Sequence, residues 1–166
     1  MAVLEVWING ESRAVAGGRD FDVLTFGVLK AIDTSCSVAI LTGSNRSTGD
    51  TLQWLNAPLR SGDTIRAVVR ASGDGSGPPT SKALLSSMSL IGDAQPPCTW
   101  VVRSCDIVVR VSGDARRDML ATLTWHHLLP KAKLEVACMP PSEKDLNQCW
   151  METQVAFDEP VAIDIT

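Results

Sequence analysis

The sequence has no tyrosine, and its aromatic side chains are five tryptophans and three phenylalanines in 166 residues. Tyrosine is the usual polar-tipped contact residue of protein-binding surfaces, so a binding surface here must rely on other side chains. Histidine is also scarce, because His126 and His127 are the two histidines of the chain. They are therefore the obvious candidates for a base near neutral pH.

Cysteine is present, but not in metal-binding or disulfide patterns. The five cysteines are an odd number, and no two of them form a Cys-x-x-Cys pair. We therefore expect neither a disulfide framework nor a metal site, and no cofactor. The chain also has no Walker loop, no Gly-x-Ser-x-Gly elbow and no Gly-x-Gly-x-x-Gly that opens a helix. These gaps favour a non-catalytic protein.

Long apolar runs are missing too. No stretch approaches the roughly 18 apolar residues that a membrane helix needs. The N-terminus has no basic start, no apolar stretch of signal length and no small-residue cleavage site. Together with the cysteine pattern, this predicts a cytoplasmic protein with no membrane partner.

Positive charge is in short supply at the C-terminal end. Nineteen acidic residues against fifteen basic ones leave a net charge of −4. Residues 143–166 carry one lysine, Lys144, and six acids, Glu143, Asp145, Glu152, Asp158, Glu159 and Asp164. An acidic section disfavours nucleic acid, because phosphate contacts need a basic footprint. It favours a basic protein partner, and the alternative is a solvated surface that maintains solubility.

What the chain does have is strand-like alternation and an apparent repeat. The segments 36–43 and 105–113 resemble each other, Thr51-Leu52-Gln53-Trp54 matches Thr122-Leu123-Thr124-Trp125, and 65–69 matches 134–138. The spacing between the copies is 69, 71 and 69 residues. Self-similarity at a nearly fixed period is typical of duplicated structure. The repeat predicts a three-stranded antiparallel meander present twice, in a pseudo-twofold arrangement, with Trp54 and Trp125 as core anchors.

The expected fold is mainly β, that is β-rich α+β, with about ten strands and one or two short helices. Strands are predicted at residues 3–9 and 11–16 around the Asn9-Gly10 turn, and then at 36–42, 48–55, 63–71, 99–111, 119–127, 132–139, 149–157 and 161–165. Helices are predicted from Asp20 or Asp22 to about Ala31, with a strand and loop as the alternative, and over 81–91.

The Gly/Pro/Ser-rich stretch divides the chain into three parts. A first β-rich unit is expected over 1–72, a linker over 73–97 and a second unit over 98–166, packed as one globular body.

The candidate site residues come from the tryptophans, the histidines and the acidic end. Trp7 and Trp150 stand opposite the stronger apolar faces of their strands, which suits either a partner surface or packing under a second layer. With the histidine pair and three carboxylates they make up the candidate binding set: Trp7, Trp150, Glu152, Asp158, Glu159, His126 and His127.

The sequence favours a protein-binding module, one version of which is an immunity-like or antitoxin-like inhibitor of a basic protein. One alternative is a small-ligand binder with its cleft near Trp54 and Trp125. Another is a hydrolase or transferase that uses Cys138 or Cys105 with a histidine. Against the last, strand parity places Cys138 on the core face, where cysteine is inert packing.

Overall fold

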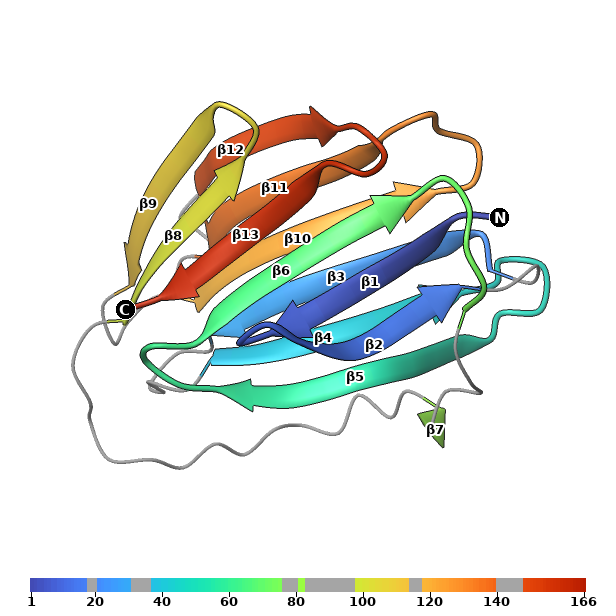
Figure 1. Cartoon of the computed structure of the whole chain (residues 1–166), viewed down its shortest axis with the longest axis horizontal. Coiled ribbons are helices and arrows are strands. Elements are labelled where there is room, and N and C mark those ends of the chain that lie inside the picture. The colour runs from blue at the N-terminus through green and yellow to red at the C-terminus, as the bar shows by residue number, and fades with distance from the viewer. Residues whose placement is uncertain (18–20, 31–36, 76–80, 83–97, 114–117, 140–147) are drawn as a thin grey trace.

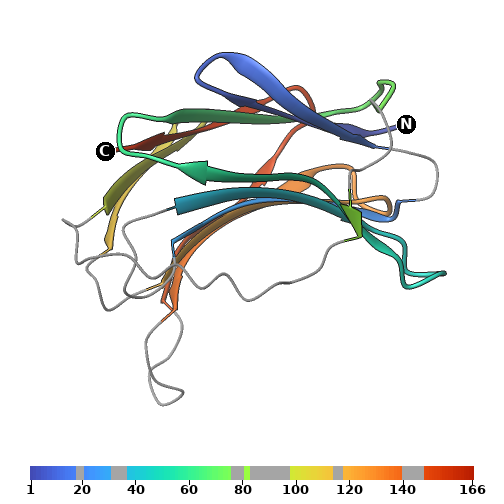
Figure 2. The same cartoon turned by 90° about the horizontal axis from the view of Figure 1, so that it is seen from below.

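Thirteen strands form two antiparallel sheets that face each other as the layers of a β-sandwich (Figure 1, Figure 2). This computed structural model describes residues 1–17, 21–30, 37–75, 81–82, 98–113, 118–139 and 148–166. Within these ranges there is no helix, and hence none with the length and apolar character needed to cross a membrane. The mainly β prediction is confirmed.

The first sheet has the strand order β2-β1-β6-β13-β8-β9, and the second has β12-β11-β10-β3-β4-β5-β7. Six strands come from the first half of the chain: β1 (Val3–Ile8), β2 (Glu11–Gly17), β3 (Val23–Lys30), β4 (Ser37–Ser44), β5 (Thr51–Leu59) and β6 (Thr64–Arg70). After the two-residue β7 (Ser81–Lys82), six more follow: β8 (Cys98–Ser104), β9 (Ile107–Gly113), β10 (Asp118–His126), β11 (Ala132–Met139), β12 (Gln148–Val155) and β13 (Pro160–Ile165).

The two sets of six strands are equivalent. In the first sheet, β2-β1-β6 corresponds to β9-β8-β13, and in the second, β5-β4-β3 corresponds to β12-β11-β10. We call β1–β6 the first copy and β8–β13 the second copy. Each copy therefore contributes three neighbouring strands to each sheet, and a pseudo-twofold axis relates them. The predicted duplicated, pseudo-twofold arrangement is confirmed.

Backbone irregularities recur at equivalent positions in the two copies. The β4–β5 register shifts between Leu41 and Thr42, and the β11–β12 register shifts between Val136 and Ala137, 95 positions later in each case. The extra residue opposite the shift is Trp54 on β5 and Trp150 on β12, again equivalent and 96 positions apart. A bulge is a specific backbone device, so its repetition with a tryptophan supports true duplication.

The sequence repeat that we predicted was aligned incorrectly. Its three strands do not form meanders, because β6 pairs with β1 and β13 instead of β5, and β9 pairs with β8 instead of β10. The duplicated unit is six strands long and its period is about 95 residues. Trp54 therefore corresponds to Trp150, and Trp125 to Lys30. The shorter match arose because any two alternating strands followed by a turn resemble each other.

Two secondary-structure predictions were also wrong. The helix expected from Asp20 or Asp22 to Ala31 is the strand β3, in which alternate residues from Leu24 to Lys30 are buried. A period of two thus prevailed over the weak helical spacing. The strand expected over 99–111 is the hairpin β8–β9, which turns at Cys105 with a φ of 46°. The predicted 81–91 helix lies outside the described residues, except for β7.

The core lies between the sheets, where alternate residues of every long strand meet. Its largest fully buried side chains include Trp100, Phe26 and Leu4. Trp100 on β8 donates its indole N–H to the Ser37 hydroxyl of β4 at 3.2 Å, which joins the two sheets across the core. As predicted, Trp125 belongs to this core and Trp54 packs against it.

Candidate functional site

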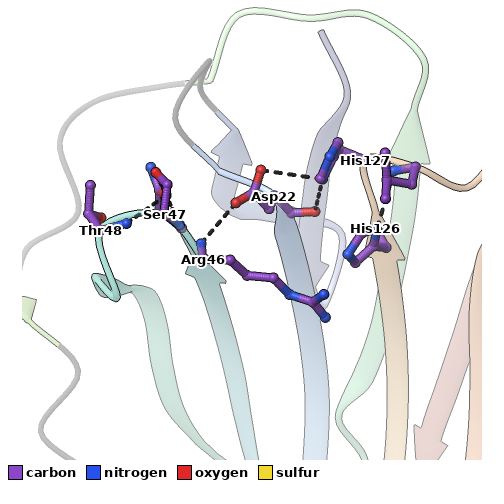
Figure 3. A network of polar contacts seen from close by, with 8 residues as sticks. Asp22, Arg46, Ser47, Thr48, His126 and His127 are labelled. Carbon is purple, nitrogen blue, oxygen red and sulfur yellow. Dashed lines mark hydrogen bonds and ion pairs between the residues drawn. The ribbon is translucent and has the colours of Figure 1, made fainter.

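One end of the sandwich gathers polar side chains from three separate segments (Figure 3). Val23, the first residue of β3, pairs with Ser44 at the end of β4 and with His126 at the end of β10. The residue before β3, Asp22, must therefore lie between the two adjoining loops. Its backbone N–H donates to the Ser44 carbonyl at 3.0 Å, and its own carbonyl accepts from the His127 N–H at 2.8 Å.

The Asp22 carboxylate connects these loops through its side chain as well. One oxygen accepts a hydrogen bond from the Arg46 backbone N–H at 2.8 Å. The other lies 3.3 Å from Nδ1 of His127. The carboxylate is thus held from both sides, and it will bind His127 more strongly when that imidazole is protonated.

The loop between β4 and β5 is fixed by its own asparagine. The Asn45 side-chain oxygen accepts hydrogen bonds from the Ser47 N–H at 2.8 Å, the Ser47 hydroxyl at 2.6 Å and the Thr48 N–H at 3.2 Å. This is the usual way in which asparagine stabilises a turn. The loop presents Arg46, whose side chain extends towards His126 in Figure 3.

The two histidine rings stack on each other, with centroids 4.8 Å apart and planes at 24°. His126 Nδ1 accepts a hydrogen bond from the Leu128 N–H at 3.2 Å, which requires this nitrogen to be unprotonated. Burial lowers the pKa of His126, and electrostatic interactions with Arg46 and with His127 lower it further, against the opposing effect of Asp22. His126 is therefore a neutral acceptor at physiological pH.

The β10–β11 turn beyond the histidines exposes two leucines, and we call Leu128–Leu129 the tip. Their relative exposures are 73% for Leu128 and 52% for Leu129. The turn is nonetheless fixed, because the Leu129 N–H donates to the His126 carbonyl at 2.8 Å in addition to the Leu128 bond. Beside the tip lies a groove of about 410 Å³, lined by Leu129, Pro130, Lys131, Ala132, Lys133, Glu152, Thr153 and Gln154.

The acidic candidates are engaged by groups of the same chain. Glu152 is exposed on β12 and lies 3.1 Å from the Lys133 ammonium. Asp158, in the β12–β13 turn, lies 3.5 Å from the Arg70 guanidinium. Glu159 accepts a hydrogen bond from the Ser104 hydroxyl at 2.9 Å. A basic partner would therefore compete with internal donors for these carboxylates.

The two candidate tryptophans lie on different sheets. Trp7 is half-buried on the outer face of the first sheet, where the Arg66 guanidinium carbon sits 5.4 Å from its ring centroid. Both residues line a shallow groove of about 370 Å³ together with Asp164 and residues of β6 and β13. Trp150 occupies the β12 bulge, and its side chain lies outside the described part. The structure thus brings His126 and His127 together, but not with Trp7.

Sequence reasoning missed the tip and the two residues that support it. Leu128 and Leu129 were assigned no role. A usable signal was present, since Leu128-Leu129-Pro130 falls between two predicted strands, where side chains are usually polar. Asp22 and Arg46 are contributed by distant loops, and single-sequence patterns do not show which loops meet.

The cysteine–histidine hypothesis receives no support from the geometry. Cys138 pairs with Met119, seven positions before His126 on β10, so about 23 Å of extended strand separates the two. Cys105 is exposed, and its hydrogen bond with Glu159 raises the pKa of its thiol. A protonated thiol is a poor nucleophile. In the part of the chain that the structure describes, no three potential ligands among His, Cys, Asp and Glu gather as a metal site.

The ligand-binding cleft predicted near Trp54 and Trp125 is occupied by packed side chains. Phe21 contacts the edge of Trp54 at a centroid distance of 4.9 Å, and the Trp54 ring lies directly over Gly43. A Cβ at Gly43 would come within 2.7 Å of the Trp54 ring, so glycine makes this packing possible. Neither tryptophan lines the two grooves described above.

No protein-family model, curated protein or solved structure matches this chain. What the chain does must therefore be argued from the geometry and chemistry of its own surface.

Proposed function

We propose that this protein is a non-catalytic protein-binding module that engages its partner through the tip, Leu128–Leu129. The observation that carries the proposal is the combination of high exposure with a hydrogen-bonded turn. Exposed leucines in a fixed turn lose little conformational freedom on binding, so nearly all of their burial contributes to affinity. The fully buried centre of an interface is its most apolar part, which is where these two leucines would lie.

The surroundings of the tip suit this role. Leu129, Pro130 and Ala132 contribute apolar lining to the groove, and Lys131, Lys133 and Glu152 contribute charged groups. An apolar centre with a polar rim is the usual anatomy of a protein interface. The groove could accept one or two side chains from the partner next to the leucines.

Charge enters the proposal as a long-range effect. The net charge of −4 attracts a basic partner even though Glu152 and Asp158 are paired within the chain. Exposed ion pairs of this kind contribute little to stability, so exchanging one for a partner's cation costs little. Electrostatic attraction mainly accelerates association. Inhibition of a toxic basic protein remains one specific version of the proposal.

The test begins with affinity capture from a lysate of the source organism. It compares the wild type, the double variant Leu128→Ser/Leu129→Ser and a control, Ser61→Ala. The control changes an exposed residue of the β5–β6 turn, which lies outside both the tip and the groove. The captured protein is then purified, and its affinity for each variant is measured by calorimetry.

We expect the double variant to bind at least about tenfold more weakly, since each leucine contributes on the order of 1 kcal/mol or more when buried. The control should bind as the wild type does, and binding should weaken as salt rises. Equal affinities of the double variant and the wild type would contradict the tip as the binding surface. Failure of the wild type to retain any protein would count against protein binding altogether.

A further inference from the structure

The outer edges of the first sheet differ between the two copies. At one edge lies β2 and at the other its equivalent, β9. Within the described part of the chain, no strand pairs with the outer side of either. An open edge presents unpaired N–H and C=O groups, and proteins usually protect it with charges, bulges or covering segments.

The β2 edge carries such protection. Glu11, Ser12 and Arg13 are all exposed, and Glu11 lies 3.8 Å from Arg13. The β1–β2 register also shifts at Val6, which bends the edge.

The β9 edge lacks both devices. Glu11 and Ser12 correspond to Ile107 and Val108, which are 39% and 61% exposed. All seven residues of β9 pair with β8 in an unbroken register. Its sequence, Ile-Val-Val-Arg-Val-Ser-Gly, is rich in β-branched residues with a single charge. This regular, apolar, open strand is suited to accept another strand.

We propose that β9 pairs antiparallel with β9 of a second copy of this chain, which joins the two six-stranded sheets into one continuous sheet. An isologous contact of this kind needs a surface that is complementary to itself. In the register centred on Val109, residues 107–111 of the two strands overlap and each Arg110 faces the partner's Val108. No charged residue then faces its own copy directly.

The charges next to this register favour the pairing. Asp106 lies in the β8–β9 turn, immediately before β9. In this register each Arg110 faces the partner's Val108, and the partner's Asp106 comes two residues, about 7 Å, away along the chain, within reach of a long side chain. Moving the register by two residues to centre it on Arg110 would place two arginines opposite each other, which is unfavourable. The charges therefore disfavour the register centred on Arg110, whereas the register centred on Val109 has no like charges face to face.

The experiment measures the mass of the full chain by sedimentation equilibrium over a wide concentration range. The test variant is Val108→Lys, and the matched control is Ser12→Lys at the equivalent position of β2. Both sites are exposed, so folding should be retained, and thermal unfolding of each variant checks this. We expect a dimer for the wild type and the control, and a dissociation constant at least about tenfold higher for Val108→Lys.

A charge exchange tests the register independently. Asp106→Lys or Arg110→Glu alone should weaken the dimer, and the two together should restore it. A wild type that stays monomeric at its highest soluble concentration would overturn the proposal, as would equal effects of Val108→Lys and Ser12→Lys. The tip variant Leu128→Ser/Leu129→Ser should dimerise normally, so this result is separate from the proposed function.

Discussion

The two copies share their backbone and almost nothing else. Strand order and the bulge at Trp54 and Trp150 recur, and so do the turns that lead into β6 and β13. In these turns Asp63 accepts from the Arg60 N–H at 2.7 Å, and the equivalent Glu159 accepts from the Ala156 N–H at 3.2 Å. The comparison teaches that a few backbone devices are enough to specify this sandwich, while the surface can diverge.

The side chains that hydrogen-bond Asp63 and Glu159 differ between the two copies. Asp63 also accepts from the Asn9 side-chain N–H at 2.8 Å, in the turn between β1 and β2. The equivalent residue in the β8–β9 turn is Cys105, which hydrogen-bonds Glu159. The same turn-to-turn link is thus made by an amide in one copy and by a thiol in the other.

The largest expected effect comes from equivalent core positions. Leu4 on β1 and Trp100 on β8 are both fully buried. We predict that Trp100→Ala lowers the free energy of unfolding by about 4 kcal/mol and Leu4→Ala by about 3 kcal/mol, because the tryptophan leaves the larger cavity. Denaturant unfolding measures both, with the exposed Lys131→Ser as a neutral control. A cost below that of the control at either position would show that the copies do not share one core.

Removing the acid of either turn should have the next largest effect. Hydrogen bonds, chiefly from Asn9 and from the Arg60 N–H, lower the pKa of Asp63. The bond with Cys105 is the largest cause that lowers the pKa of Glu159. We predict that Asp63→Asn or Glu159→Gln costs about 1–2 kcal/mol at neutral pH, since a charged acceptor is lost.

The pH dependence follows from the same shifts. Because both pKa values are lowered on folding, this stabilisation is complete above about pH 5 and is lost as the pH falls through the lowered values. The variant that carries both Asp63→Asn and Glu159→Gln should therefore lose less stability than the wild type between about pH 5 and pH 2. Urea midpoints across this range provide the measurement. Parallel pH profiles would contradict the assigned role of the two acids.

A smaller effect separates two buried tryptophans. The Trp100 indole N–H has a partner in Ser37, whereas the buried indole N–H groups of Trp54 and Trp125 have none in the described structure. Removal of an unsatisfied donor regains part of its desolvation cost. Trp100→Phe should therefore destabilise the protein by about 1 kcal/mol more than Trp125→Phe in equilibrium unfolding. Equal costs would mean that the two indoles are equally satisfied in solution.

The smallest predicted effect concerns the turn at Cys105. This residue has a φ of 46°, and its equivalent, Asn9, has 54°. Asparagine adopts this left-handed conformation more readily than cysteine. We predict that Cys105→Asn stabilises the protein by about 0.5 kcal/mol. Melting temperature is the measurement, with Cys105→Ser as the comparison, and a decrease with asparagine would contradict the equivalence of the two turns.

Local patterns predicted much of the fold, and pairings between distant segments account for what they missed. The Asn9-Gly10 pair predicted the first hairpin correctly, because both residues favour a left-handed backbone conformation. The Cys105-Asp106 turn has no such chemistry, so β8 and β9 were merged. The length of the duplicated unit could not be predicted from the sequence either, because the two copies share backbone geometry but few identical side chains. The tip and its support by Asp22 depend on loops that meet only in the folded chain.

The pseudo-twofold axis passes through two strand pairings, β3 with β10 and β6 with β13. At the first, Gly27 faces Thr122, and at the second, Arg66 faces Ala162. A symmetric assembly of identical halves would force each of these residues to face its own copy. The chain instead places a small residue opposite a larger one at both points. Two separate fragments, one for each copy, should therefore choose each other over themselves, so the duplication has become a pair of unlike and mutually specific halves.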